Sequence, residues 1–389
     1  MKSIKLDLLT NPQWLKCQAA TILATTGTAF FTLWTSKTGY TEREIIGLLA
    51  FLYTLTFLPL LVSKTTSLAK GGLLISSVCL LLAGLGVTPI GIGLCAFIAS
   101  MQLSRDLFYI GMMDEYVSIA KRHKVDTRYV IGLALLFGLL VSMVTSPLIG
   151  YTSETNANLY FIILSVIGII LTFALERTQR ENRDKRESRY IPSSVIALCS
   201  LSLVSNIPMF FIRYFVIPMA IIKFAGELGF SDNVMVIAGT LISLMTAIGF
   251  LVHRRPNPQK YIIHMSVGLF ASLLSCVFIV LSTIDKTVLE LQEAAVVFLL
   301  AYASLEVTSK VWTVNFIAAL TKVSSNLDEP EVAYKCFAKY KSAGGAIGYG
   351  VAFLLIPHLE STIIGLHFTI FAFGFCGAVL AGLYKEKWL

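Results

Sequence analysis

The stretch ERTQRENRDKRESRY, residues 176–190, is the longest charged run in the chain. Apolar segments long enough to cross a bilayer recur on both sides of it, six before it and six after it. The run is therefore interpreted as a basic cytoplasmic linker, residues 176–191, between two six-helix bundles at residues 1–175 and 192–389.

The composition indicates a membrane protein. Of the 389 residues, 56% are hydrophobic and only 14% are charged, which is too little polar surface for a soluble domain. We predict an all-α polytopic protein with twelve transmembrane helices. The predicted spans are residues 13–35, 43–63, 71–88, 90–113, 129–150, 157–175, 193–222, 233–252, 261–283, 293–317, 341–358 and 362–384. The first has no small-residue cleavage site, so we expect it to be retained.

The net charge of +8 reports topology rather than a nucleic-acid partner. With both termini placed in the cytoplasm, 24 of the 31 Lys and Arg residues lie in inner segments and four in outer loops. Such an asymmetry is the positive-inside rule. We expect a monomer in a lipid bilayer, at the inner membrane of a bacterium.

The seven cysteines show no paired spacing. This pattern predicts neither a disulfide framework nor a zinc site, so we interpret them as small apolar fillers. No cofactor or metal is expected.

Short matches at a nearly constant offset indicate an internal repeat. GYTE (39–42) and GFSD (229–232) are similar in kind at an offset of 190, and further on Asp106 corresponds to Glu306 at an offset of 200. We interpret the halves as two six-helix pseudo-repeats, as found in some transporters.

Two local patterns predict details of single helices. Thr41 and Glu44 fit a capping box, in which each side chain satisfies a backbone N–H of the other at the start of a helix. Asn206, Pro208 and Pro218 predict that the seventh span is bent or broken.

Small residues recur every four positions in the fifth and eleventh spans, where they let helix backbones approach closely. This packing or hinge set consists of Gly138, Ser142, Ser146 and Gly150, with Pro147 as a local kink, and of Ser342, Ala346 and Gly350. Tight packing alone explains the pattern; a hinge seam between the halves is the functional alternative.

Five ionisable residues lie inside predicted spans: Arg105, Asp106, Arg213, Glu306 and Lys310. A charge at the bilayer centre costs about 3 kcal/mol, so such residues usually face a cavity or a partner. We predict that Arg105, Arg213 and Lys310 bind substrate, because basic side chains hold anionic groups, and that Asp106 and Glu306 carry protons.

A structural role is the alternative for each of these charges. Glu306 and Lys310 are four residues apart and can neutralise each other on one helix face. Arg105 and Asp106 are adjacent and point in different directions. Arg213 has no acid nearby in its own span, so it needs a partner from another span or a ligand.

The chain resembles the major facilitator superfamily in its twelve spans, its six-plus-six division and its basic central loop. SPLIG (146–150) is similar to the antiporter motif of that family, and PLLVSK (59–64) and GFLVHR (249–254) are degenerate forms of its loop motif. LLTNPQW (8–14) resembles the start of its macrolide, siderophore and drug exporters. In this family spans 1, 4, 7 and 10 line the central cavity, and the five charges fall on three of those.

The resemblance implies a secondary active transporter that moves a small organic solute by alternating access, driven by a proton or ion gradient. We expect efflux by an antiporter of a siderophore-, antibiotic- or metabolite-like compound. Uptake of an organic anion, an iron chelate or a peptide-like metabolite is the first alternative, and a non-transporting receptor or immunity protein is the second. No catalytic motif suggests an enzyme.

Overall fold

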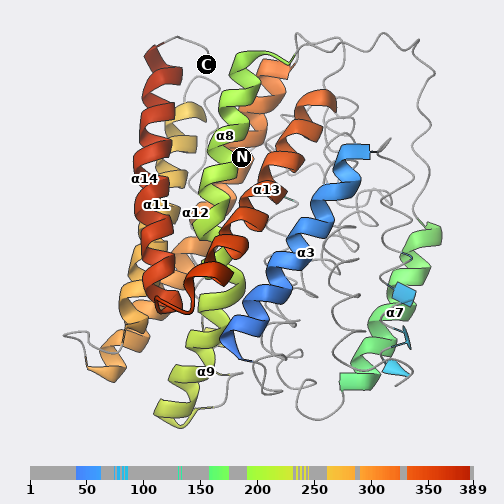
Figure 1. Ribbon diagram of the computed structural model, residues 1–389, viewed down its shortest axis with the longest axis vertical. Helices are drawn as coiled ribbons and strands as arrows, with labels where there is room; N and C mark the ends of the chain where they lie inside the picture. Colours follow the sequence, from blue (N-terminus) through green and yellow to red (C-terminus); the bar gives the residue numbers. More distant parts are fainter. Residues whose placement is uncertain are drawn as a thin grey trace, which may run out of the picture.

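The computed structural model describes residues 41–62, 157–174, 191–230, 261–284, 290–324 and 331–385, and a few isolated positions between 74 and 85, at 130 and 133, and between 234 and 244. Every regular element among these residues is a helix (Figure 1). Four of the helical segments are long and apolar enough to cross a membrane: Ser193–Leu228, Ile263–Thr283, Leu291–Ser324 and Ser361–Lys385.

The central rod consists of α8 (Ser193–Phe211), the π-helical turn η1 (Ile212–Val216) and α9 (Ile217–Leu228). It begins after Pro192, whose extended backbone cannot continue a helix. It ends at Gly229, which has φ +71° and whose left-handed conformation costs a glycine little. The predicted bend of this span is therefore a local widening of the helix and not a break.

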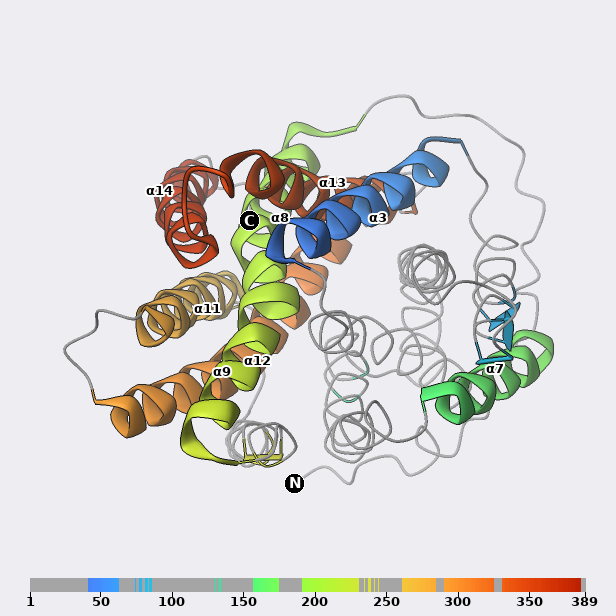
Figure 2. The same cartoon turned by 60° about the horizontal axis from the view of Figure 1, so that its bottom comes forward.

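The other C-terminal helices surround this rod (Figure 2). They are α11 (Tyr261–Thr283), α12 (Leu291–Ser324), α13 (Glu331–Leu355) and α14 (Ser361–Lys385). Most large side chains of the rod are consequently buried, and Phe211, Ile212 and Phe215 are completely so.

Glycines bring α13 against α8. A Cβ atom on Gly344 would collide with the carbonyl oxygen of Leu203, and one on Gly348 would lie 3.2 Å from the Ile207 side chain. Residue numbers rise together along both helices, so α8 and α13 run parallel. Without side chains at the contact, the two backbones approach as closely as small residues allow in membranes.

Hydroxyl groups line the contact between α11 and α12. The oxygens of Ser272 and Thr308 lie 3.0 Å apart, and those of Ser275 and Ser304 lie 2.9 Å apart. Hydroxyls that bond to each other across helices need no water. These two helices therefore form a tightly joined pair beside the rod.

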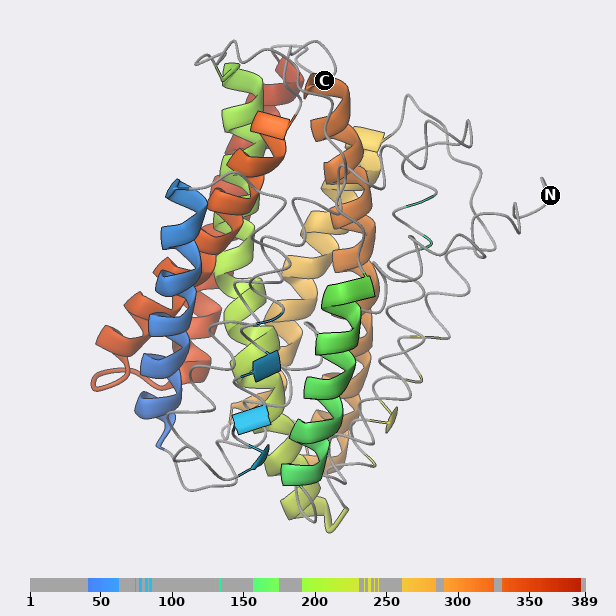
Figure 3. The same cartoon turned by 90° about the vertical axis from the view of Figure 1, so that its right-hand side faces the viewer.

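The helix α3 (Glu42–Val62) lies along α13 (Figure 3). The Tyr53 and Tyr349 rings stack with centroids 5.1 Å apart, and the guanidinium of Arg43 lies 5.2 Å from the centre of the Phe353 ring. At the start of α3 the Thr41 N–H donates to Glu44 Oε2 at 2.8 Å and the Glu44 N–H donates to Thr41 Oγ1 at 3.3 Å, so the predicted capping box is confirmed.

The helix α7 (Ala157–Ala174) lies away from α8, as Figure 2 shows. The Ser165 hydroxyl donates to the Ser77 carbonyl at 2.6 Å. Large apolar side chains such as Ile170 and Phe173 are 60% and 78% exposed. Such a surface suits contact with lipid.

The predicted spans agree with the helices to different degrees. Residues 261–283 match α11 at both ends, whereas α12 continues to Ser324 and α13 begins at Glu331, ten residues before its predicted span. Apolar runs mark the thickness of the hydrocarbon layer, and a helix continues past it wherever its sequence permits. The spans predicted at residues 43–63, 157–175, 193–222 and 362–384 correspond to α3, α7, the rod and α14. The spans predicted at residues 13–35, 71–88, 90–113, 129–150 and 233–252, the count of twelve and the six-plus-six division lie wholly or largely outside the described residues.

Candidate functional site

An ion pair joins the rod to α12. Arg213 Nε donates to Glu306 Oε1 at 2.8 Å, and Arg213 Nη2 donates to the Ser309 hydroxyl at 2.8 Å. The guanidinium thus bonds to two side chains one helical turn apart. The sequence predicted that Arg213 needs a partner from another span or a ligand, and the structure supplies the former.

The π-helical turn explains how Arg213 comes to this position. Pro218 has no N–H to donate to the Tyr214 carbonyl, and its ring would clash with that carbonyl in a regular helix. The helix widens over Ile212–Val216 instead, and the Ile217 N–H donates to the Ile212 carbonyl five residues earlier. Single π turns of this kind are frequent at functional sites.

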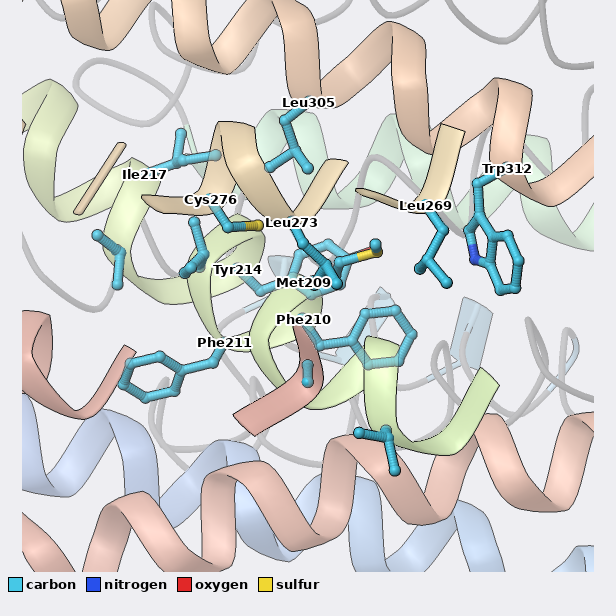
Figure 4. Close-up of a cluster of buried hydrophobic side chains, with 14 of the residues drawn as sticks. Met209, Phe210, Phe211, Tyr214, Ile217, Leu269, Leu273, Cys276, Leu305 and Trp312 are labelled. Atoms are coloured by element: carbon cyan, nitrogen blue, oxygen red, sulfur yellow. The ribbon is translucent and has the colours of Figure 1, made fainter. Parts of the chain in front are cut away.

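Buried apolar side chains of the rod, α11 and α12 cluster around the π-helical turn that carries Arg213 (Figure 4). Tyr214, Ile217, Leu273 and Leu305 are each less than a tenth exposed. The Arg213 and Glu306 side chains are 20% and 17% exposed. Charges in such a medium need a partner, because desolvation of a lone charge costs several kcal/mol.

Lys310 is a second base near Glu306. It lies one turn further along α12, close enough to interact electrostatically with the carboxylate. Mutual neutralisation of Glu306 and Lys310 was the structural alternative from the sequence, and the structure gives Glu306 a direct ion pair with Arg213 at 2.8 Å. Together the three side chains carry a formal charge of +1.

Ser309 and Tyr302 are members of this site that the sequence did not indicate. Ser309 is buried and bonds to Arg213, and Tyr302 lies one turn before Glu306, close enough to interact with both charges. A signal existed for Ser309, since it is three residues from Glu306 and so shares its helix face.

Arg105 and Asp106 lie outside the described residues. Their predicted roles in substrate binding and proton transfer, and the correspondence of Asp106 with Glu306, stay predictions. The same holds for Gly138, Ser142, Ser146, Pro147 and Gly150.

In the eleventh span the close helix contact involves glycines that the sequence did not single out. Gly344 and Gly348 face α8, and Gly345 faces the Tyr53 ring of α3. Of the predicted set, Ser342 is buried and Ala346 is half-buried, whereas a Cβ atom on Gly350 would meet no described atom within 4 Å. The hinge role of Ser342, Ala346 and Gly350 stays a prediction.

Within the part of the chain that the structure describes, no group of three or more His, Cys, Asp or Glu side chains is placed to hold a metal ion. The substrate-binding role predicted for Arg213 and Lys310 and the proton-carrying role predicted for Glu306 stay predictions.

Comparison with known proteins gives a likeness at the level of the fold. No family model and no curated protein matches the sequence. A crystal structure of the nucleoside transporter NupG, in a mutant form, is similar to this chain with a TM-score of 0.59 and 13% sequence identity. The likeness covers 95% of this chain and 99% of that one. Together with the long apolar helices, it shows an integral, multi-pass membrane protein that shares the fold of that transporter.

Proposed function

We propose that this protein is a secondary active transporter that moves a small organic solute across the membrane by alternating access. The observation that carries the proposal is the Arg213–Glu306 ion pair, which joins a π-helical turn to a second helix inside a fold shared with a solved transporter. An ion pair in an apolar setting stabilises little by itself. A binding role accounts for its presence better than a purely structural one.

The pair couples the charge of Arg213 to the protonation of Glu306. While Glu306 is ionised, its carboxylate occupies Arg213 Nε, so an anionic group on a solute must displace it. When Glu306 is protonated, its carboxyl group no longer competes with the solute for Arg213. The positive charge of the guanidinium is then uncompensated by Glu306 and can attract an anion. Proton and anion then bind in the same conformational state, which is the requirement for moving them in the same direction.

We therefore propose proton-coupled uptake of an organic anion. Arg213 and Lys310 supply the positive charge for such a solute, as the first alternative from the sequence requires. Efflux, the direction first expected, is supported by SPLIG and LLTNPQW, both of which lie outside the described residues.

The proposal is tested with the purified protein in proteoliposomes. Uptake of citrate, ferric citrate and dialanine is measured with and without an inward proton gradient, and uridine and erythromycin serve as neutral and efflux-type solutes. We expect at least one anion to accumulate only with the gradient. Accumulation of erythromycin in inside-out vesicles without any anion uptake would support efflux instead, and the absence of any flux would favour a receptor.

The role of Glu306 is tested with Glu306→Gln, which keeps the hydrogen-bonding shape and cannot ionise. We expect uptake that no longer responds to the proton gradient, with solute exchange retained. Glu293→Gln is the matched control, because Glu293 lies on the same helix with an exposed side chain, and it should behave as the wild type. An unchanged gradient dependence in Glu306→Gln would remove this carboxylate as the coupling acid.

A further inference from the structure

Lys341 of α13 is a base that the sequence placed at the edge of the eleventh span and that the structure places well inside a helix. The helix α13 begins at Glu331, ten residues earlier. The Lys341 ammonium lies 5.7 Å from the centre of the Phe210 ring on α8 and 6.0 Å from the centre of the Phe337 ring on its own helix. Both aromatic residues are buried and Lys341 is half-buried. The ammonium is therefore held at the contact between the rod and α13.

The two ring contacts orient the charge of Lys341 without cancelling it. A cation within about 6 Å of a ring centre is attracted to the face of the ring. The ring itself has no net charge, so it cannot neutralise the ammonium as the Glu306 carboxylate neutralises Arg213. Among apolar side chains little water screens such a charge, and its attraction for an anion is strong.

One of the two rings leads to Arg213. The centroids of the Phe210 and Tyr214 rings are 5.6 Å apart, and Tyr214 is the residue next to Arg213 in the π-helical turn (Figure 4). Phe210 itself is three residues before Arg213, so the two share a face of the rod. The ring that holds Lys341 thus belongs to the wall of the Arg213 site.

The other ring leads to Lys310. The Phe337 ring lies 5.0 Å from the Phe316 ring of α12, and the Phe316 ring lies 5.0 Å from the Trp312 ring, measured between centroids. Trp312 is two residues beyond Lys310. Three bases from three different helices are therefore connected through one set of aromatic contacts, with Lys341 at its centre.

The backbone of Lys341 lies nearer than Arg213 to the membrane face that the charge distribution predicts to be cytoplasmic. Three residues beyond Lys341, Gly344 contacts the Leu203 carbonyl. Leu203 precedes Arg213 by ten residues, which is about 15 Å along a helix. Both α8 and α13 begin at the predicted cytoplasmic face, so an anion that leaves Arg213 for the cytoplasm moves in the direction of Lys341.

We propose that Lys341 is a second anion-binding residue, which takes up the solute from Arg213 and Lys310 on its way to the cytoplasm. The inference rests on the proposed uptake of an organic anion, because it names where the imported anion binds next. An anion without a partner is costly in apolar surroundings. Transfer from one base to the next keeps it compensated at each step.

A purely structural role is the alternative. The ammonium of Lys341 would then only strengthen the contact between α8 and α13 through the Phe210 ring. Its loss would lower the unfolding temperature and leave the affinity for anions unchanged. Affinity and stability, measured on the same variants, therefore separate the two roles.

The first test is a binding measurement on the full-length protein in phospholipid nanodiscs, which leave both faces accessible. Citrate and ferric citrate are titrated calorimetrically into the wild type, Lys341→Gln and Lys341→Arg. We expect Lys341→Gln to weaken the binding of at least one anion about tenfold, as loss of a charged hydrogen-bond donor does. Lys341→Arg should bind like the wild type, because it keeps a cation that stacks on aromatic rings.

Lys339→Gln is the matched control. It removes the same charge from the same helix, but residues two apart on a helix point about 200° away from each other. Its affinity for the anions should equal that of the wild type. If Lys341→Gln does not fold, reductive methylation of the wild type decides, read by mass spectrometry. Citrate should protect Lys341 and not Lys339, and equal protection of both would overturn the site.

The second test is transport by vesicles of opposite orientation. Lys341→Gln should raise the KM for the anion at the cytoplasmic face more than at the outer face, because Lys341 lies on the cytoplasmic side of Arg213. An equal change at both faces would overturn the placement of Lys341 on the cytoplasmic part of the path.

Failure of this inference is distinguishable from failure of the proposed transport, because binding is measured without flux. A wild type that binds an anion through Lys341 and moves none would refute transport and leave the Lys341 site in place. Anion transport with unchanged affinity in Lys341→Gln would overturn the Lys341 site alone. A wild type that binds neither anion would overturn both.

Discussion

The central rod Ser193–Leu228 and the last helix α14 are equally apolar, yet the protein uses them differently. Their most apolar windows have the same mean hydropathy, but 78% of that window is buried in the rod and 33% in α14. On α14, Ile370 and Phe371 are 60% and 58% exposed, whereas Ile196 is the one large apolar side chain of the rod among those prominently exposed. Hydropathy therefore identifies a membrane helix without saying whether it faces lipid or protein.

The largest difference in stability between variants of the rod and of α14 is expected when a charged side chain is removed. Arg213→Leu removes the direct ionic partner of Glu306 and should lower the free energy of unfolding by about 3–5 kcal/mol, because a largely buried carboxylate loses its hydrogen-bonded partner. Lys385→Leu at the exposed end of α14 should change it by less than about 0.5 kcal/mol. Reversible unfolding in mixed micelles measures both.

The double variant Arg213→Leu/Glu306→Leu distinguishes the cause. If the uncompensated charge is responsible, removing both partners should restore most of the stability lost in the single variant. A double variant as unstable as Arg213→Leu would show instead that the guanidinium stabilises the π-helical turn independently of Glu306.

Aromatic truncation should give the next largest contrast. Phe211 is fully buried and contacts the rings of Phe215, Tyr349 and Phe368. Phe211→Ala should cost about 3 kcal/mol, because a cavity forfeits its packing contacts. Phe371→Ala on α14 should be close to neutral in the same unfolding measurement, since Phe371 is 58% exposed. Equal losses in the two variants would contradict the difference in burial.

Adding a single methyl group should have opposite effects on stability where α13 packs against the rod and on α14. Gly344→Ala forces α13 away from the Leu203 carbonyl and should cost about 1–3 kcal/mol through overpacking. At Gly382 of α14 a Cβ atom meets no described atom within 4 Å, and Gly382→Ala should be neutral or stabilise by about 0.5–1 kcal/mol through helix propensity. Thermal unfolding of the two variants side by side checks the sign.

The smallest difference in stability is expected when a single tyrosine hydroxyl group is removed. The Tyr349 hydroxyl donates to the Phe210 carbonyl from a fully buried side chain, so Tyr349→Phe should lose about 1 kcal/mol. Tyr384 on α14 is 81% exposed, and Tyr384→Phe should leave the unfolding midpoint unchanged. A neutral Tyr349→Phe would mean that water or another group replaces the lost donor.

Part of the site was predictable from the sequence. Arg213 and Glu306 were identified because a charge inside an apolar run needs a partner or a cavity. Of the two possibilities for Arg213, a partner from another span or a ligand, the structure shows the first. The identity of that partner was not predictable. Sequence spacing favoured Lys310 for Glu306, since residues four apart share a helix face, but it carries no information about which helices adjoin.

The local features of single helices were predictable from the sequence, whereas the contacts between helices were not. The capping box at Thr41 and the π-helical turn before Pro218 depend on neighbouring residues, because capping and proline effects act within one turn. From the sequence, the glycines that bring α13 to α8 were not distinguishable from those with no described atom within 4 Å of an added Cβ. Gly344 and Gly350 differ only in what lies opposite each of them.

The sequence by itself determined that this chain is a membrane protein with charges inside its spans, because burial of polar groups in lipid is so costly that composition and local spacing must show it. The tertiary structure decided which charge meets which and which of two equally apolar helices becomes central. Those outcomes depend on contacts between residues far apart in the chain, and such contacts exist only once the helices have packed.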